Sequence, residues 1–241
     1  MNTFFKEELY FSSFETDGRR FTFLLNSRCD HIQQFLAKGS FYEREELELL
    51  SRYATGRARL LDIGANIGNH SIFLAHRLNL TRVVPIEAQP AILHILRANL
   101  GLNWHRSFDL SYIGLALSDQ TGSARIQFAG EVNIGGTKIT PRLDEDSFGE
   151  PAEGTEIVPM HAGDDLFEPG DFDLIKLDVE SLEINVLKGL KNLLQRFRGI
   201  LFIEIFDANR EELNELITGI GFRKLDEYRR YARCSNIIFE K

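Results

Sequence analysis

The chain has 241 residues, 43% of them hydrophobic, and a formal net charge of -8 at pH 7. This length fits one α/β domain with an appendage and allows a full hydrophobic core. The negative charge argues against nucleic acid or an anionic membrane as the main partner, and no apolar run reaches the roughly 18 residues of a spanning helix. Because the start lacks a signal-peptide pattern and the two cysteines form no disulfide framework, we expect a cytoplasmic protein.

The N-terminal part predicts a hairpin followed by helices. Residues 9–25 carry alternating aromatic residues around Asp17-Gly18, which is a strong hairpin signal. Residues 30–54 have a helical pattern that is interrupted at 39–43. The hairpin and the helices therefore precede the main alternation of strands and helices.

The interruption contains Tyr42 and Glu43. Two interpretations remain open for these residues. They lie over the cofactor as part of a lid, or they belong to a helix–helix turn whose aromatic side chains fill the core. We predict a hairpin and helical lid segment over 1–55 and a cofactor-binding domain over 56–241.

Residues 59–70 predict a buried strand, a glycine turn and the start of a helix. The apolar run at 60–63 is typical of a strand that is covered on both faces. Gly64 permits a close backbone approach, and Asn66 is the non-glycine residue that best tolerates a positive φ. After Gly68 the apolar spacing becomes helical. Backbone N–H groups and a helix N-terminus thus point to whatever lies beyond the strand end.

Strands and helices alternate over the rest of the chain. Further strands are expected at 82–87, 110–117, 124–128, 172–179 and 199–206, and 129–156 is expected to be a loop or insertion. The final runs, 222–230 and 234–239, are almost directly connected and should be antiparallel. The fold class is therefore α/β: a Rossmann-like, mainly parallel seven-stranded sheet with a final antiparallel strand, plus the N-terminal hairpin and helices.

The glycine turn and the following strand indicate a nucleoside cofactor. Glu87 ends that strand, and an acid about 20 residues after such a turn accepts hydrogen bonds from ribose hydroxyls. The dinucleotide fingerprint is absent, because Asn66 occupies its second glycine position. Asp62 would repel a pyrophosphate but suits a cationic or zwitterionic tail. We therefore favour S-adenosylmethionine over NAD, with a plain strand–turn–helix connection and an exposed Glu87 as the alternative.

Acidic residues at the strand ends provide catalytic candidates, since ligands of open parallel sheets lie beyond these ends. Asp178 and Glu180 are the strongest, because a carboxylate there would accept the proton of an acceptor hydroxyl. Lys176 shares a face of its strand with Asp178. It either forms a structural ion pair with Asp178 or Glu204, or it contacts the substrate. We predict no metal site, and we expect His70 on the surface of its helix, with a position facing the cofactor as the alternative.

The motifs together resemble the FkbM methyltransferases, which belong to the Rossmann-like, S-adenosylmethionine-dependent class. The resemblance runs from about residue 31 to the end and rests on the order and spacing of several motifs: Tyr42-Glu43, Asp62 to Gly68, Glu87-Ala88-Gln89-Pro90, Asn99 to Asn103, Ala116 to Asp119, Asn133 to Thr137, and Ile175 to Glu180. Two positions depart from the family pattern, Ser181 in place of Gly and Ala88 in place of Pro.

The resemblance implies roles for these motifs. Gly64, Asn66 and Gly68 would hold the methionine part, Glu87 the ribose, Ala116 and Leu117 the adenine, and Asp178 would lie near the methyl group. The full set of cofactor-binding candidates is Asp62, Gly64, Ala65, Asn66, Gly68, Asn69, Glu87, Ala88, Ala116, Leu117 and Asp178. The substrate-binding candidates are Tyr42, Glu43, Asn133, Gly136, Lys176 and Glu204.

The predicted function is O-methylation of a hydroxyl group on a small metabolite, sugar or polyketide-like acceptor. The alternatives are an NAD(P)-dependent reductase of Rossmann type and a non-catalytic nucleoside-binding domain. The reductase shares the glycine turn and Glu87, but the sequence lacks the Tyr-x-x-x-Lys pair of short-chain reductases.

Overall fold

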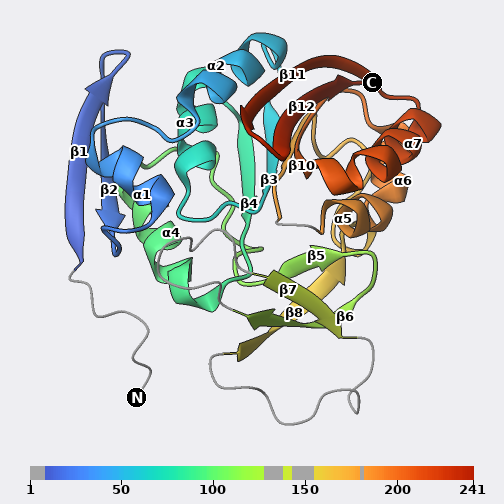
Figure 1. Ribbon diagram of the computed structural model, residues 1–241. Helices are drawn as coiled ribbons and strands as arrows, with labels where there is room; N and C mark the ends of the chain where they lie inside the picture. Colours follow the sequence, from blue (N-terminus) through green and yellow to red (C-terminus); the bar gives the residue numbers. More distant parts are fainter. Residues whose placement is uncertain (1–8, 128–137, 143–154, 180–181) are drawn as a thin grey trace.

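The computed structural model describes residues 9–127, 138–142, 155–179 and 182–241 (Figure 1). A six-stranded sheet with the order β11-β12-β10-β9-β3-β4 forms its centre. Its strands are β3 (Arg59–Ile63), β4 (Arg82–Ile86), β9 (Leu174–Leu177), β10 (Ile200–Phe206), β11 (Arg223–Tyr231) and β12 (Cys234–Glu240). The pairs among β4, β3, β9 and β10 are parallel, and β12 is antiparallel to both of its neighbours. The expected α/β sheet with a final antiparallel strand is confirmed.

The predicted seventh strand of this sheet is wrong. Residues 108–115 form only two isolated parallel bridges beside β4, Val83 with Phe108 and Glu87 with Ile113. Gly114 has a φ of 107°, which breaks an extended run, and its N–H donates to the Glu87 carbonyl at 2.8 Å. The sheet is therefore a mixed sheet of six strands instead of seven.

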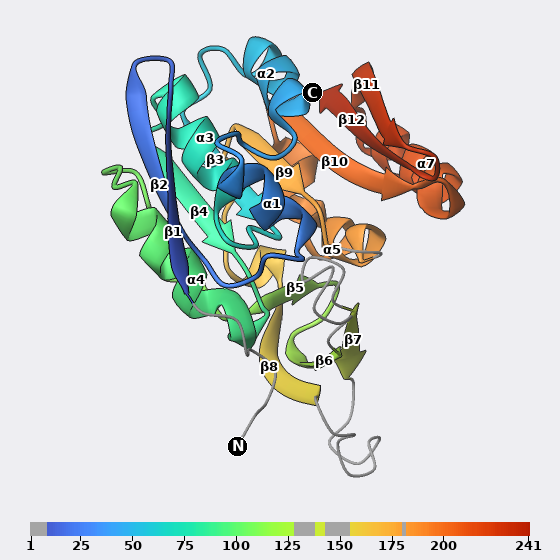
Figure 2. The ribbon, with the colours of Figure 1, turned by 60° about the vertical axis from the view of Figure 1, so that its left-hand side comes forward.

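Helices cover both faces of the central sheet (Figures 1 and 2). Because neighbouring strand residues point to opposite faces, Leu60 and Phe202 pack with one set of helices, and Leu61 and Ile203 pack with the other. The first set is α1 (His31–Ala37), α2 (Arg44–Tyr53), α3 (Asn69–Leu78) and α4 (Pro90–Leu102). The second set is α5 (Glu183–Gly189), α6 (Lys191–Arg196) and α7 (Arg210–Ile220). Two short 3-10 helices, η1 (Gly163–Asp165) and η2 (Asp207–Asn209), lie in the connections.

The predicted hairpin is confirmed as β1 (Tyr10–Thr16) and β2 (Arg19–Leu25). Two asparagines at the C-terminal end of α4 bind the free edge of β2. Asn99 Oδ1 accepts from the Leu24 N–H at 2.7 Å, and Oδ1 of Asn103, the residue that follows α4, accepts from the Thr22 N–H at 2.9 Å. Asn99 Nδ2 also donates to the Ile67 carbonyl at 2.9 Å. The hairpin is therefore tied to α4, and α4 is tied to the glycine turn.

A second sheet of four strands has the order β5-β8-β6-β7. Its strands are β5 (Ala116–Ser118), β6 (Gly122–Gln127), β7 (Lys138–Arg142) and β8 (Thr155–Ala162). We expected a loop or insertion at 129–156, and within that range β7 forms a strand that pairs antiparallel with β6. This strand gives hydrogen-bond partners to the backbone groups of β6 on the side away from β8. No helix in the described part of the chain is long and apolar enough to cross a membrane.

Candidate active site

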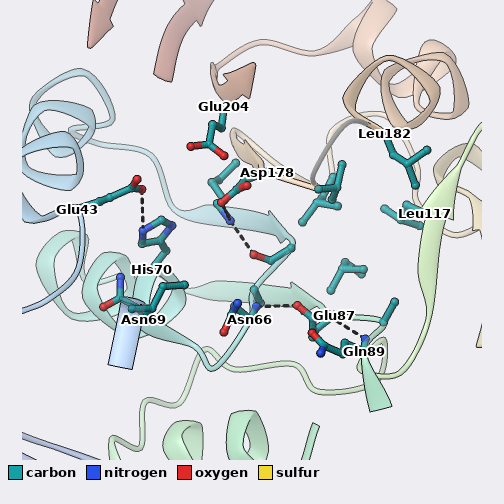
Figure 3. A pocket seen from close by; sticks show the side chains of 18 of the residues that line it. Glu43, Asn66, Asn69, His70, Glu87, Gln89, Leu117, Asp178, Leu182 and Glu204 are labelled. Atoms are coloured by element: carbon teal, nitrogen blue, oxygen red, sulfur yellow. Dashed lines mark hydrogen bonds and ion pairs between the residues drawn. The ribbon is translucent and has the colours of Figure 1, made fainter. Parts of the chain in front are cut away.

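A cavity of about 530 Å³ opens at the carboxyl ends of β3, β4, β9 and β10 (Figure 3). This volume is within the usual range of small-molecule sites, and the location is the one where parallel sheets bind ligands. The cavity is lined by nine of the cofactor-binding candidates, Gly64, Ala65, Asn66, Asn69, Glu87, Ala88, Ala116, Leu117 and Asp178. It is also lined by four of the substrate-binding candidates, Tyr42, Glu43, Lys176 and Glu204.

The glycine turn brings bare backbone to the wall of this cavity. Gly64 has a φ of 80°, and a Cβ built on it would lie 1.8 Å from the Asp178 carbonyl oxygen. Asn66 has a φ of 50°, as its residue type predicted. Glycine at position 64 is thus required both by the conformation and by the close approach of the Asp178 backbone, which directly follows β9.

Glu87 holds the turn in place through its carboxylate. Oε2 accepts the Asn66 N–H and Oε1 accepts the Gln89 N–H, each at 2.8 Å. Burial raises the pKa of Glu87 above its ordinary value, although hydrogen bonds from the backbone N–H groups of Gln89, Asn66 and Ala88 act in the opposite direction. The carboxylate has about four acceptor positions in all, so at least one remains for a ligand hydroxyl.

Lys176 forms the centre of a buried charge cluster. Its Nζ lies 3.3 Å from Asp62 Oδ1 and 3.4 Å from Asp178 Oδ2, and it donates to the Gly64 carbonyl at 2.7 Å. Burial would lower the pKa of Lys176, but the two carboxylates outweigh burial and raise it. The expected pairing with Asp178 is confirmed, and the pairing with Asp62 on β3 was missed because it depends on strand register.

Two cofactor-binding candidates do not line the cavity. The Asp62 side chain is 0% exposed, and its Oδ2 accepts from the Ser71 hydroxyl at 2.5 Å. Gly68 lies under the turn, where a Cβ would meet Leu96 at 3.1 Å. Both residues lie behind the cavity wall, so their contact with a cofactor stays a prediction from the sequence.

Asp178 is ionised at neutral pH. Burial would raise its pKa, but the Lys176 ammonium and a hydrogen bond with Glu204 outweigh burial, and the pKa of Asp178 lies below its ordinary value.

Three further candidates, Glu180, Asn133 and Gly136, lie outside the described residues.

The turn between α1 and α2 forms another wall of the cavity. Asn69 clamps it from the start of α3: Oδ1 accepts the Tyr42 N–H at 3.1 Å, and Nδ2 donates to the Tyr42 carbonyl at 3.0 Å. Glu43 has a φ of 55° and a side chain that is only 4% exposed. Its Oε2 lies 3.4 Å from Nε2 of His70. His70 was expected on the surface, but it is buried and lines the cavity.

The C-terminal strands complete the opening and were not predicted to contribute. Tyr231, Arg233 and Cys234 line the cavity at the β11–β12 connection. The Tyr231 hydroxyl lies 2.7 Å from that of Tyr42 and 3.3 Å from Nε2 of His31. No local signal marks these residues, because they reach the site only through the antiparallel return of the chain.

Solved structures with this arrangement define the class of the fold. The crystal structure of methyltransferase FkbM from Methylobacillus flagellatus KT has a TM-score of 0.52 at 17% identity, over 75% of this chain and 43% of that chain. M. jannaschii TYW2, in complex with AdoMet, has a TM-score of 0.50 at 15% identity, over 100% of this chain and 89% of that chain. The chain thus has a Rossmann-like methyltransferase fold.

The family follows from the sequence. The model of the methyltransferase FkbM domain matches residues 62–231, and the chain belongs to this family. The resemblance that the motifs predicted is therefore confirmed. The hexuronic acid methyltransferase AglP of Haloferax volcanii is 28% identical over 162 residues, which are 66% of this chain and 61% of that relative. The match thus spans less than two thirds of the relative's length.

The comparisons do not support the exclusion of nucleic acid that we drew from net charge. The crystal structure of the M. jannaschii tRNA m1G37 methyltransferase shares the fold, with a TM-score of 0.53 at 11% identity, over 98% of this chain and 57% of that chain. At this identity the likeness concerns the fold alone. The fold is therefore compatible with a nucleic-acid acceptor as well as with a small-molecule acceptor.

Proposed function

We propose that the protein is an S-adenosylmethionine-dependent methyltransferase that methylates a hydroxyl group of a small, sugar-like acceptor. The observation that carries this proposal is the Glu87 carboxylate, which lies at the cavity wall beside the glycine turn and keeps acceptor capacity for a ribose hydroxyl. Membership of the FkbM methyltransferase family supports the reaction class. The same membership does not favour the reductase or the non-catalytic alternative.

The residues of the cavity fit the cofactor. Gly64 offers a backbone surface without a side chain, as a closely held methionine part requires. Ala88, Ala116 and Leu117 offer apolar contacts for an adenine, since all three are buried and line the cavity. When bound, S-adenosylmethionine would supply the activated methyl group on its sulfonium, and the protein would position it.

We assign Asp178 to the sulfonium side of the site. An ionised carboxylate that is already paired with Lys176 is a weak base, because a base works best when its pKa is near the operating pH. The same negative charge is favourable beside a cation. The earlier hypothesis that Asp178 and Glu180 accept the hydroxyl proton is therefore replaced for Asp178, and Glu180 remains a candidate from sequence.

The acceptor is proposed to be a sugar acid or a related anionic sugar. The name of the Haloferax volcanii relative includes hexuronic acid. In this chain Arg233 is exposed and lines the cavity, and it forms no ion pair with the residues that the structure describes. A guanidinium at this position suits a carboxylate of the acceptor. We further propose that residues 1–55 form a separate segment that closes the acceptor side through Tyr42 and Glu43.

Two measurements test this proposal. Isothermal titration calorimetry should detect binding of S-adenosylmethionine to the wild-type protein. Incubation with S-adenosylmethionine and a panel of methyl glycosides of glucuronic acid, galacturonic acid, glucose and mannose should yield a methyl ether and S-adenosylhomocysteine by mass spectrometry. Absence of cofactor binding would refute the proposed function, and methylation of a nitrogen or carbon atom instead would refute the hydroxyl specificity.

A further inference from the structure

His70 and Glu43 form a buried pair in the cavity, and neither residue is among those assigned above to the cofactor. Nε2 of His70 lies 3.4 Å from Oε2 of Glu43, and the two side chains are 8% and 4% exposed. Figure 3 shows the imidazole between Glu43 on one side and Asp178 with Glu204 on the other. A histidine that is oriented by a carboxylate on one ring nitrogen has its second nitrogen available for proton transfer.

The backbone on which Glu43 and His70 stand is held in a fixed conformation at the cavity wall. Glu43 adopts a φ of 55°, which a residue with a side chain rarely does and which is frequent at functional sites. The adjacent Tyr42 is held to α3 by both hydrogen bonds of Asn69, and His70 directly follows Asn69 in that helix. The same clamp therefore fixes the carboxylate and the imidazole relative to each other.

We propose that His70 is the general base of the methyl transfer and that Glu43 is its positioning residue; this inference rests on the proposed function. Two other ionisable groups of the cavity, Asp178 and Tyr42, are poor bases. Asp178 is paired with Lys176, and burial together with Glu43 raises the pKa of the Tyr42 phenol and keeps it protonated. His70 Nδ1 makes no hydrogen bond with the described residues.

The proton transfer follows from this geometry. With Nε2–H directed at Glu43, Nδ1 of His70 accepts the proton of the acceptor hydroxyl while the oxygen forms its bond to the methyl carbon. The carbon–sulfur bond breaks, and its electron pair stays on the sulfur. The imidazolium formed in this step faces the Glu43 carboxylate and afterwards releases its proton to water. The 3.4 Å separation is longer than a hydrogen bond, and such contacts commonly shorten when the substrate is bound.

His70→Gln tests the base role, with His94→Gln as the matched control, because His94 is exposed on α4 and lies outside the cavity. The assay uses the panel glycoside that the wild type methylates. For His70→Gln we expect kcat to fall by about 100-fold or more, with the KM of the acceptor and the affinity for S-adenosylmethionine within about threefold of wild type. Added imidazole should restore part of the activity of His70→Ala. His94→Gln should match the wild type.

Glu43→Gln tests the positioning role by a measurement that needs no acceptor. The ¹⁵N NMR shifts of the His70 ring, assigned by comparison with His70→Gln, should show the Nε2–H tautomer in the wild type and a changed tautomer ratio or ring protonation in Glu43→Gln. Identical ¹⁵N shifts of the His70 ring in the wild type and in Glu43→Gln would overturn the positioning role of Glu43.

The outcomes separate this inference from the proposed function. A wild type that binds no S-adenosylmethionine overturns both. A wild type that is active while His70→Gln keeps its kcat within threefold overturns the base role alone. Loss of cofactor affinity in a folded His70→Gln, without imidazole rescue of His70→Ala, also overturns it, because His70 would then be structural.

Discussion

Replacing Lys176 with Met should strongly destabilise the protein. The Lys176 side chain is 1% exposed and that of Asp62 is 0% exposed, with 3.3 Å between Nζ and Oδ1. Methionine keeps most of the volume but removes the charge, so that Asp62 remains buried with Oδ1 unsatisfied, since Lys176 is its one partner among the described residues. Removing one member of a buried ion pair costs about 3–5 kcal/mol. We expect a loss in this range in the free energy of unfolding.

Urea unfolding followed by circular dichroism measures this loss, and an unchanged m-value shows that the midpoint shift reports stability. Lys188→Met is the control, because Lys188 and Glu212 form an ion pair with 49% and 56% exposed side chains. That variant should lose less than about 1 kcal/mol. Adding Asp62→Asn to Lys176→Met should recover at least about 1 kcal/mol, since the two sites are coupled. Equal losses for Lys176→Met and Lys188→Met would refute the reasoning.

Three further variants test other parts of the account. Gly64 has a φ of 80° and no space for a Cβ, so Gly64→Ala should lose about 1–3 kcal/mol of unfolding free energy from the backbone alone and bind S-adenosylmethionine at least about tenfold more weakly in calorimetry. Gly101 has open space around it, so Gly101→Ala should show neither loss. Equal affinities of the two variants for S-adenosylmethionine would contradict the close-approach argument. The hydrogen bond from Arg210 is the main cause that lowers the pKa of Glu227 to about 2, so this carboxylate stabilises the fold above its unfolded pKa of about 4.3 and the stabilisation is lost as the pH falls toward about 2. Glu227→Gln should therefore be less stable than wild type in thermal melts at about pH 6 and equal to it near about pH 2, and a pH-independent difference would contradict the assignment. Arg233→Gln should raise the KM of a glucuronoside at least about fivefold and leave that of a neutral glycoside and the cofactor affinity unchanged; parallel changes for both glycosides would remove the anion-binding role.

Local patterns predicted the elements whose signals lie within a few residues. Asp17 and Gly18 both have positive φ, 52° and 72°, as the hairpin turn requires. Asn66 has the positive φ expected from its residue type. The carboxylate at the end of β4 was found from its spacing after the glycine turn, because that spacing is a property of one strand–helix–strand unit.

Features that depend on distant parts of the chain were not predicted. The contact of Lys176 with Asp62 requires the register in which these two residues stand side by side on β9 and β3. The place of His70 in the cavity depends on Glu43, which is 27 residues earlier in the sequence. The expected seventh strand failed because a run of apolar residues does not reveal a positive φ at Gly114. Pairing and burial of polar groups are tertiary properties, and a single sequence does not specify them.

The central claim is that the cavity at the carboxyl ends of β3 and β4 holds an adenosyl group. A crystal structure of the protein with S-adenosylhomocysteine tests it most directly. We predict density in this cavity, with the ribose hydroxyls donating to the Glu87 carboxylate and the sulfur on the side of Asp178. Density for the ligand elsewhere, or side chains of the lining residues filling the cavity at saturating ligand, would contradict the account.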